Sequence, residues 1–338
     1  MDVGLFDQDL LKHTTRIYGV NWTIFDKNHS KTICIKWILE DEYGKKYFLK
    51  EKPYYLNNEE FKNTIEFHSI LRSKGIHTPY ILKNKSENRI FKFANRMFVI
   101  YEWVEGNTLS PKNSNDLTAL GMQLAIFHKL KLNKQGSWNS PLCRYLHFLD
   151  IRKKDMNEIF KILNSFGPDD AELSTLINEL QRWISFNEKT IDWDKLEKSW
   201  LHGDPHLFNF IKKINGEMVF IDLDDMHWGY RLSDLIWAIT ICCIWDWDTV
   251  NANPIIRESI NSEVLSKIID SYEQVSGLNE MEKKAIPYFL VAMIIKSVVC
   301  IKGLIRNSKN LASKDVIYYL QRVKLLVNDI EVKFNVTS

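Results

Sequence analysis

The stretch WLHGDPHLFNFIKKINGEMVFIDLDDMHWGYRLSD, residues 200–234, decides how the rest of the chain is interpreted. Two short apolar runs, Phe208–Ile211 and Met218–Leu223, lie on either side of Asn215-Gly216. Asn-Gly between two apolar segments is a strong signal for a tight β-hairpin, because both residue types tolerate positive φ. The sequence therefore predicts a hairpin whose first strand follows a polar loop and whose second strand ends in a cluster of aspartates.

This hairpin is expected to gather oxygen-bearing side chains from its two ends. Asp204 and Asn209 stand just before the first strand or at its start, and Asp222 stands at the end of the second. A hairpin brings the residue before its first strand beside the residue after its second, so we expect the three side chains to converge. Carboxylate and amide oxygens suit a hard cation such as Mg²⁺. The arrangement predicts a phosphoryl-transfer site in outline.

The segment HGDPHLFN, residues 202–209, resembles the H-G-D-x-H-x-x-N catalytic loop of the aminoglycoside phosphotransferase and choline kinase superfamily. Asp204 and Asn209 have the same five-residue offset as the Asp and Asn of the protein-kinase loop. The segment VFIDLDDMHWGYRLSDL, residues 219–235, is similar to the metal-binding segment that follows in that superfamily, especially in its bacterial stress-response kinase and spore-coat kinase branches. A motif of this length is far less expected by accident than a lone His-Gly-Asp.

The resemblance implies an α+β, bilobal protein-kinase-like fold. Residues 1–103 would form a small nucleotide-binding N-lobe of antiparallel sheet plus helix, and residues 104–338 a larger, mainly helical C-lobe with the catalytic hairpin. The resemblance also assigns Asp204 as catalytic base, and Asn209 and Asp222 as Mg²⁺ ligands. Four residues are expected to support the site: His202 and His206 by hydrogen bonds within the loop, Asp224 beside the metal, and Asp234 as a brace for the catalytic loop.

The first hundred residues fit such an N-lobe. Strand-like segments rich in β-branched and aromatic residues surround one helix-like segment, about Asn58–Lys74, which ends before Gly75. Lys50 ends one of the strands and Glu66 lies on the helix, so the resemblance assigns Lys50 to the nucleotide phosphates and Glu66 to holding that lysine. Neighbouring lysines and other glutamates of the helix leave both assignments open on residue type alone.

Two more segments bear on nucleotide binding. A G-x-G-x-x-G phosphate loop is absent from the sequence, and the polar turn at residues 26–31 makes Ser30 and backbone amides the candidates to face the phosphates. The run FVIYEWVEGNTL, residues 98–109, matches the superfamily's linker between lobes. By that resemblance the nucleotide base is expected to bind the backbone of three linker residues, Glu102, Trp103 and Val104. The alternative for residues 26–31 is a plain solvated turn, and the alternative for residues 98–109 is an edge strand that turns at Gly106.

The tetrapeptide Trp245-Asp246-Trp247-Asp248 follows an apolar, helix-like segment, residues 232–244. Its alternation of aromatic rings and negative charges suits an acceptor rim that stacks on the cation of an amine substrate. The alternative is a loop whose tryptophans belong to the core, and the residue types favour the core.

Composition places the chain among ordinary globular proteins. Of its 338 residues, 45% are hydrophobic and 26% are charged, and the net charge of +2 gives no reason to expect nucleic acid or a membrane as partner. Five cysteines without a C-x-x-C pair indicate a reducing cytoplasm rather than disulfides or a zinc site. The acidic start of the chain does not resemble an export signal. Ala285–Ile305, interrupted by Lys296 and Lys302, is expected to be a buried helix rather than a membrane span.

These observations favour an ATP- and Mg²⁺-dependent kinase, with GTP as the alternative nucleotide. Its acceptor would be a hydroxyl of a small molecule, such as an aminoglycoside-like antibiotic, an amino alcohol or a similar metabolite. Only residues 223–233 separate Asp222 from Asp234, which suits a small acceptor better than an extended peptide. A Ser/Thr protein kinase of the stress-response type is the first alternative. A catalytically idle kinase-fold scaffold, suggested by the missing glycine loop, is the second. The sequence leaves the oligomeric state open between monomer and homodimer.

Overall fold

The structure is a computed structural model, and it describes residues 3–28, 34–131, 151, 153–246, 255–301 and 313–336. The chain divides into two compact units. The first comprises Met1–Thr108 and Phe210–Asp224, and the second comprises Leu109–Asn209 and Asp225–Ser338. The segment that follows the catalytic loop therefore belongs with the N-terminal part of the chain, whereas sequence order alone groups it with the C-terminal part.

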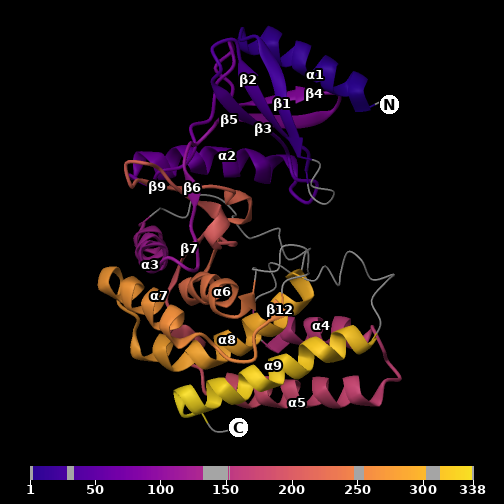
Figure 1. Cartoon of the computed structure of the whole chain (residues 1–338), viewed down its shortest axis with the longest axis vertical. Helices are drawn as coiled ribbons and strands as arrows, with labels where there is room; N and C mark the ends of the chain where they lie inside the picture. Colours follow the sequence, from indigo (N-terminus) through magenta and orange to yellow (C-terminus); the bar gives the residue numbers. More distant parts are fainter. Residues whose placement is uncertain are drawn as a thin grey trace. The chain divides into compact units, whose positions relative to one another are not determined.

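A five-stranded antiparallel sheet forms the centre of the first unit (Figure 1). Antiparallel neighbours can be joined by short connections, and the order in the sheet follows the chain closely. The strands lie in the order β1 (Trp22–Asn28), β2 (Lys36–Asp41), β3 (Lys46–Glu51), β5 (Arg96–Glu102) and β4 (Ile90–Phe93).

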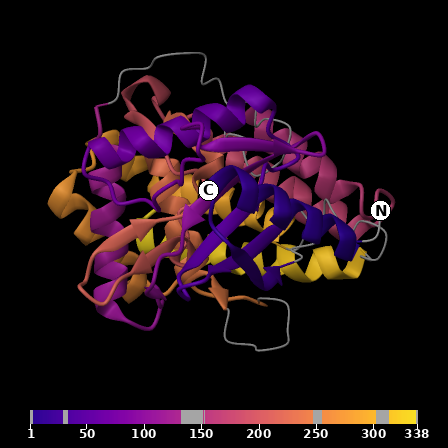
Figure 2. The ribbon, with the colours of Figure 1, turned by 90° about the horizontal axis from the view of Figure 1, so that it is seen from above.

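Side-chain alternation gives the two faces of this sheet different characters. Tyr47 and Leu49 of β3 point to one face, where they join a buried apolar cluster that includes Leu10 of helix α1 (Val3–Tyr18). In both views α1 lies against the strands (Figures 1 and 2). Phe48 and Lys50 occupy the alternate positions, so the strand itself delivers Lys50 to the face opposite α1.

Helix α2 (Asn58–Ser73) begins and ends where its sequence predicts. Asn57 accepts a hydrogen bond from the amide of Glu60, and the Glu60 carboxylate accepts one from the amide of Asn57, which is a capping box. At the other end Gly75 has a φ of +82° and closes the helix in the left-handed conformation that glycine adopts without strain. Local chemistry therefore fixes both ends of this helix.

The predicted hairpin is present in the first unit. Strands β8 (Phe210–Lys212) and β9 (Met218–Phe220) pair antiparallel, and β6 (Asn107–Thr108) pairs with the other edge of β8. Gly216 has a φ of +83°, whereas Asn215 is not in the left-handed region. Asn215 instead accepts a hydrogen bond from the amide of Glu217 through its side chain. The turn is therefore a longer loop with glycine at its left-handed position, not a two-residue Asn-Gly turn.

The second unit is mainly helical. Its helices pack around a buried apolar centre that includes most of α8, and α9 lies beside α5 (Figure 1). Its helices are α3 (Ser114–His128), α4 (Lys153–Asn164), α5 (Ala171–Glu188), α6 (Arg231–Cys243), α7 (Ser262–Val275), α8 (Glu280–Ile301) and α9 (Ser313–Phe334). Two small antiparallel pairs complete it: β7 (Lys198–Leu201) with β10 (His227–Tyr230), and β11 (Trp245–Asp246) with β12 (Ile255–Ile256).

The apolar segment that the sequence assigned to a buried helix is α8, and its described side chains from Ala285 to Val299 are buried. Across the described ranges, no helix has both the length and the apolar character needed to cross a membrane. Cys34, Cys242 and Cys243 are buried free thiols, and burial raises the pKa of each. Cys143 and the side chain of Cys300 lie outside the described residues.

Candidate active site

The catalytic loop, residues 202–209, follows strand β7 in the second unit, and its first two residues form hydrogen bonds with Asp234. Asp234 lies in the first turn of α6 and is 2% exposed. Its carboxylate accepts hydrogen bonds from the amides of His202 at 2.6 Å and Gly203 at 3.1 Å. Gly203 has a φ of +88°, and a Cβ at this position would lie 2.1 Å from the carbonyl oxygen of Asp225. The Asp234 carboxylate thus anchors the start of the catalytic loop, and the loop requires glycine at position 203.

A buried histidine keeps this brace charged. His128 of α3 lies 3.2 Å from Asp234 through Nε2 and 2.8 Å from the hydroxyl of Tyr272 through Nδ1. Burial by itself raises the pKa of Asp234, but the hydrogen bond and charge of His128 outweigh it, and the pKa lies below its ordinary value. Asp234 is thus ionised at neutral pH, the state in which a carboxylate accepts both amide bonds most strongly.

Asp204 projects from this braced loop with its carboxylate held by side chains of the same unit. The indole Nε1 of Trp237 donates to Oδ1 at 2.8 Å, and Nε2 of His206 lies 3.3 Å from Oδ2. The side-chain nitrogen Nδ2 of Asn209 donates to the backbone carbonyl of Asp204 at 2.9 Å. The Asp204 side chain remains 35% exposed. A substrate hydroxyl can therefore reach an oxygen whose orientation is already fixed.

The electrostatics of Asp204 keep its carboxylate ionised at neutral pH. Burial raises its pKa, but the charge and hydrogen bond of His206, with the bond from Trp237, outweigh that effect and lower the pKa to about 2. At neutral pH the carboxylate is therefore charged and only weakly basic. The side-chain nitrogen Nδ2 of Asn209 forms its hydrogen bonds within the loop, to Asp204 and His206. The side-chain oxygen of Asn209 is therefore the atom left to bind a cation.

Trp237 is a site residue that the sequence analysis missed. Its indole contacts Asp204, and the Lys296 ammonium lies 5.9 Å from its ring centroid. The one available signal was its position three residues after Asp234 in α6, which places both side chains on neighbouring parts of one helix face. An apolar-looking Ile-Trp-Ala run does not by itself separate such a residue from the core.

Replacing Trp237 with Phe tests this contact. The substitution removes the hydrogen bond to Asp204 and keeps an aromatic ring, and a bond to an ionised group is worth enough to lower kcat by about tenfold when it is lost. KM for the nucleotide should stay unchanged. Steady-state kinetics of Trp237→Phe would be compared with Trp183→Phe, which removes another indole-to-carboxylate bond, to Glu331 at 2.8 Å, elsewhere in the same unit. Equal kcat in the two variants would contradict a positioning role.

In the first unit Lys50 is the centre of a buried charge cluster. It is 3% exposed, and its ammonium lies 2.5 Å from Oδ1 of Asp222 and 2.5 Å from Oδ2 of Asp224. Lys36 approaches Asp222 at 3.6 Å. Burial alone would lower the pKa of Lys50, but the two carboxylates outweigh it and raise the pKa well above the ordinary value. Lys50 is therefore a fixed positive charge.

The two carboxylates of this cluster differ in what they can do. The Asp222 side chain is 38% exposed, whereas that of Asp224 is 6% exposed, and burial raises the pKa of Asp224. Asp222 also has a φ of +56°, a conformation that is rare for residues other than glycine and that is often found at functional sites. Asp222 is thus available to a ligand, and Asp224 holds Lys50 from the interior.

The predicted pairing of Lys50 with Glu66 is corrected by this geometry. The Glu66 side chain is exposed on α2, and the carboxylates that contact Lys50 are Asp222 and Asp224. His68 of α2 lines the same cavity as Lys50 and is buried, with its ring centroid 5.4 Å from that of Tyr101. The helix was predicted correctly, but the choice among its residues was not.

A cavity of about 240 Å³ adjoins the charge cluster within the first unit. Lys36, Lys50 and Asp222 line its polar part. The remaining lining is mainly apolar or aromatic and comes from Phe48, His68, Pro79, Tyr101, Glu102, Trp103, Val104, Ile211 and Ile221. An apolar chamber that ends in a small set of charged groups is the usual form of a small-molecule site.

The linker residues Glu102, Trp103 and Val104 line this cavity. The amide of Glu102 donates to the carbonyl of Tyr80 at 2.8 Å, and that of Trp103 donates to the carbonyl of Lys46 at 3.3 Å. The Glu102 carboxylate pairs with Lys45 at 2.6 Å. Because two of the three linker amides already have partners, a bound base would depend on the amide of Val104 and on the carbonyls of the linker.

The proposed acceptor rim is not supported by Trp245. This residue is 1% exposed, and its indole donates to the hydroxyl of Ser297 at 3.0 Å, so it belongs to the core. Asp246 is half-buried. Trp247 and Asp248 lie outside the described residues, as does Ser30 of the candidate phosphate loop.

The predicted metal ligands are divided between the units, with Asn209 in the second and Asp222 in the first. The predicted convergence of Asp204, Asn209 and Asp222 therefore remains a prediction. Within the part of the chain that is described, no group of three or more His, Cys, Asp or Glu side chains could hold a metal ion by itself.

A sheet unit with a buried lysine–aspartate pair and a helical unit with a braced His-Gly-Asp loop together define a kinase-like phosphotransferase. The model of the Phosphotransferase enzyme family, APH, matches residues 36–261, and the chain belongs to this family. The predicted family, the α+β kinase-like fold and the enzyme class, a kinase acting on an alcohol group, are thereby confirmed.

Solved structures of small-molecule kinases share this fold along nearly the whole chain. A microcompartment-associated aminopropanol kinase is 16% identical with a TM-score of 0.69, covering 98% of this chain and 99% of its own. An amicoumacin kinase in complex with AMP-PNP, Ca²⁺ and Ami is 17% identical with a TM-score of 0.65, covering 98% and 96%. A spectinomycin phosphotransferase in complex with ADP and spectinomycin is 16% identical with a TM-score of 0.62, covering 97% and 98%.

Proposed function

We propose that this phosphotransferase moves the γ-phosphoryl group of ATP to a hydroxyl of a small molecule, such as an antibiotic, an amino alcohol or a related metabolite. The observation that carries the nucleotide half of the proposal is the cavity of the first unit, in which an apolar chamber ends on Lys50 and Asp222. The aminopropanol, amicoumacin and spectinomycin enzymes of the same fold support the small-molecule half.

The donor set fits a nucleotide with a divalent cation. Lys50 supplies a fixed positive charge for phosphate oxygens, and Asp222 supplies an accessible carboxylate in a strained backbone position. Mg²⁺ is commonly bound by one or two protein oxygens together with substrate phosphates rather than by an all-protein cage. Asp222 and the side-chain oxygen of Asn209 would hold the ion, which neutralises phosphate charge when it is bound.

On the acceptor side, Asp204 would orient the attacking hydroxyl. Its carboxylate accepts the hydroxyl hydrogen bond and takes the proton late, as the phosphoryl group moves, so a pKa of about 2 does not disqualify it as a base. Trp237, His206 and the Asp234 brace fix its position before substrate binds. Transfer of this type depends mainly on positioning and charge, which such a preorganised carboxylate provides.

The short segment between Asp222 and Asp234 favours a small acceptor over a protein. Its residues from His227 to Tyr230 form β10, which pairs with β7, and α6 begins at the next residue, Arg231. No stretch remains for an activation segment that could carry an extended peptide. This observation supports a small acceptor, and the substrate panel below separates it from a protein kinase of the stress-response type.

A substrate panel tests the proposal. Wild-type protein and Asp204→Asn would be incubated with labelled ATP or GTP, Mg²⁺, hydroxylated antibiotics, amino alcohols and generic protein substrates. We expect phosphate on at least one small hydroxyl compound with the wild type only, and ATP preferred to GTP. Phosphate on protein alone would instead indicate the protein kinase, and no nucleotide binding at all would indicate an idle scaffold.

A further inference from the structure

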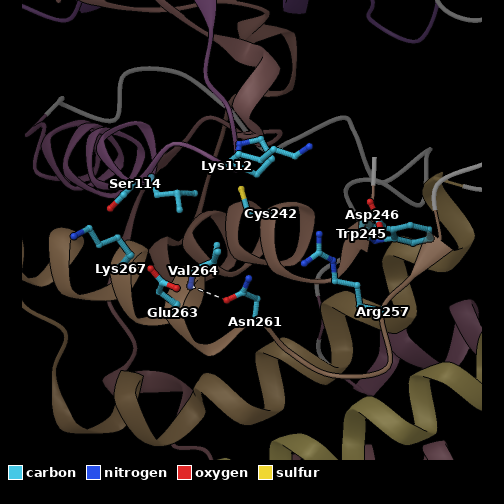
Figure 3. A pocket seen from close by; sticks show the side chains of 12 residues that line it. Lys112, Ser114, Cys242, Trp245, Asp246, Arg257, Asn261, Glu263, Val264 and Lys267 are labelled. Atoms are coloured by element: carbon cyan, nitrogen blue, oxygen red, sulfur yellow. Dashed lines mark hydrogen bonds between the residues drawn. The ribbon is translucent and has the colours of Figure 1, made fainter. Parts of the chain in front are cut away.

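The second unit contains a polar cavity of its own, with a volume of about 290 Å³ (Figure 3). It lies among the start of α3, the end of α6, the strand β11 and the start of α7. Its charged lining consists of Lys112, Asp246, Arg257, Glu263 and Lys267. Trp245 and Asp246 of the predicted acceptor rim line this cavity, whereas Lys50, Asp222 and the residues of the catalytic loop do not.

Arg257 is the group that makes this cavity informative. The backbone amide of Arg257 donates to the carbonyl of Ile244 at 2.8 Å, which fixes the main chain beside the end of α6. Its side chain is directed into the space between Trp245 and Val264 (Figure 3). Among the described residues, the buried Nε has no hydrogen-bond partner. A buried donor of a charged group without an acceptor is costly, so its presence calls for an explanation.

The carboxylates of the cavity do not neutralise this guanidinium. Asp246 and Glu263 also line the space, but within the described ranges neither forms an ion pair with Arg257. Lys112 and Lys267 add two further positive charges to the lining. Three cationic side chains against two carboxylates leave the cavity with a net positive charge. The net charge of this lining is therefore opposite in sign to the charge that a rim for an amine substrate would need.

We propose that this cavity binds a small oxyanion, a carboxylate or a phosphate group, through the guanidinium of Arg257. Arginine presents its donors in a planar fork that matches the paired oxygens of either group, and a bound oxyanion would supply the acceptor that the buried Nε lacks. The exposed amino groups of Lys112 and Lys267 would strengthen the local positive potential. The proposal does not rest on the proposed function, because it concerns binding and no phosphoryl transfer.

Calorimetry on the full chain tests the site with two probes, inorganic phosphate and malonate. We expect at least one probe to bind the wild type, and Arg257→Gln to weaken that binding by about tenfold or more. Arg257→Lys keeps the positive charge but loses the planar pair of donors. Its affinity for the probe should therefore lie between those of the wild type and Arg257→Gln. Arg182→Gln, which changes an exposed arginine of α5 in the same unit, should bind like the wild type. The preferred probe distinguishes a phosphate ligand from a carboxylate ligand.

Stability measurements keep the test interpretable. Because Arg257→Gln removes a buried Nε donor that has no hydrogen-bond partner among the described residues, we expect its melting temperature to equal or exceed that of the wild type. Any phosphate that binds near Lys50 would contribute equally to the wild type and to Arg257→Gln. Absence of binding for both probes, or binding that Arg257→Gln leaves unchanged, would overturn the proposal.

Discussion

Asp204→Asn is expected to lower the rate of phosphoryl transfer by about 10²- to 10⁴-fold, the usual contribution of a positioned general base. Asparagine has almost the same shape, and its amide oxygen can still accept the bond from Trp237. The substitution removes the negative charge that attracts the hydroxyl proton and the ability to take that proton. It leaves the cavity of the first unit untouched, so nucleotide affinity should change little.

The measurement combines single-turnover kinetics with calorimetry of a nonhydrolysable ATP analogue. Asp192→Asn is a matched control, because Asp192 is an exposed carboxylate of the same unit that pairs with Lys195 at 3.0 Å. The control should retain both activity and nucleotide affinity. Transfer by Asp204→Asn at the wild-type rate would remove Asp204 from the mechanism, and loss of nucleotide binding in the same variant would point to a folding defect instead.

Features that depend on neighbouring residues could be predicted from the sequence. The hairpin and the glycine at position 75 that ends helix α2 were predictable because each is decided within a few residues. The type of turn in the hairpin could not be predicted, because Asn215 can adopt either of two local conformations. It could adopt positive φ itself, or it could accept a bond from the Glu217 amide with its side chain, and the structure has the second.

The partner of Lys50 could not be predicted in the same way. Asp222 lies 172 residues further along the chain, and no local pattern reports such a contact. Helical periodicity identified α2 correctly, but several of its residues were candidates, and periodicity does not say which one faces a given strand. The phosphotransferase motif identified Asp222 and Asp224 as important without indicating that they hold the lysine.

The tryptophans of α6 and of the segment after it also could not be assigned to the site or to the core from the sequence. Trp237 and Trp245 stand at the middle and just beyond the end of one apolar helix, and both look like core residues in the sequence. One indole donates to Asp204 and the other to Ser297 in the interior. Only the tertiary position of the hydrogen-bond acceptor separates a site tryptophan from a structural one, and that position is set by packing.

The second large effect is expected for Asp222→Asn, which should weaken metal-dependent nucleotide binding by about 10- to 100-fold, the range for losing a contact to a charged group. Asparagine is the appropriate replacement because it tolerates the left-handed backbone better than alanine does, and Asp222 has a φ of +56°. Charge is therefore removed without added strain. Lys50 keeps its second partner, Asp224, so the buried ammonium does not become unpaired.

Calorimetry with and without Mg²⁺ separates the two contributions of Asp222. If its carboxylate binds the ion, the wild type should gain affinity for the ATP analogue on addition of Mg²⁺, and Asp222→Asn should show little of that gain. Without the metal, the variant should bind as well as the wild type or better, because a negative charge near the phosphates has been removed. Asp41→Asn, at an exposed turn of the same unit, is the control. A full Mg²⁺ effect in Asp222→Asn would show that Asp222 serves only to hold Lys50, and the metal ligand would have to be sought elsewhere.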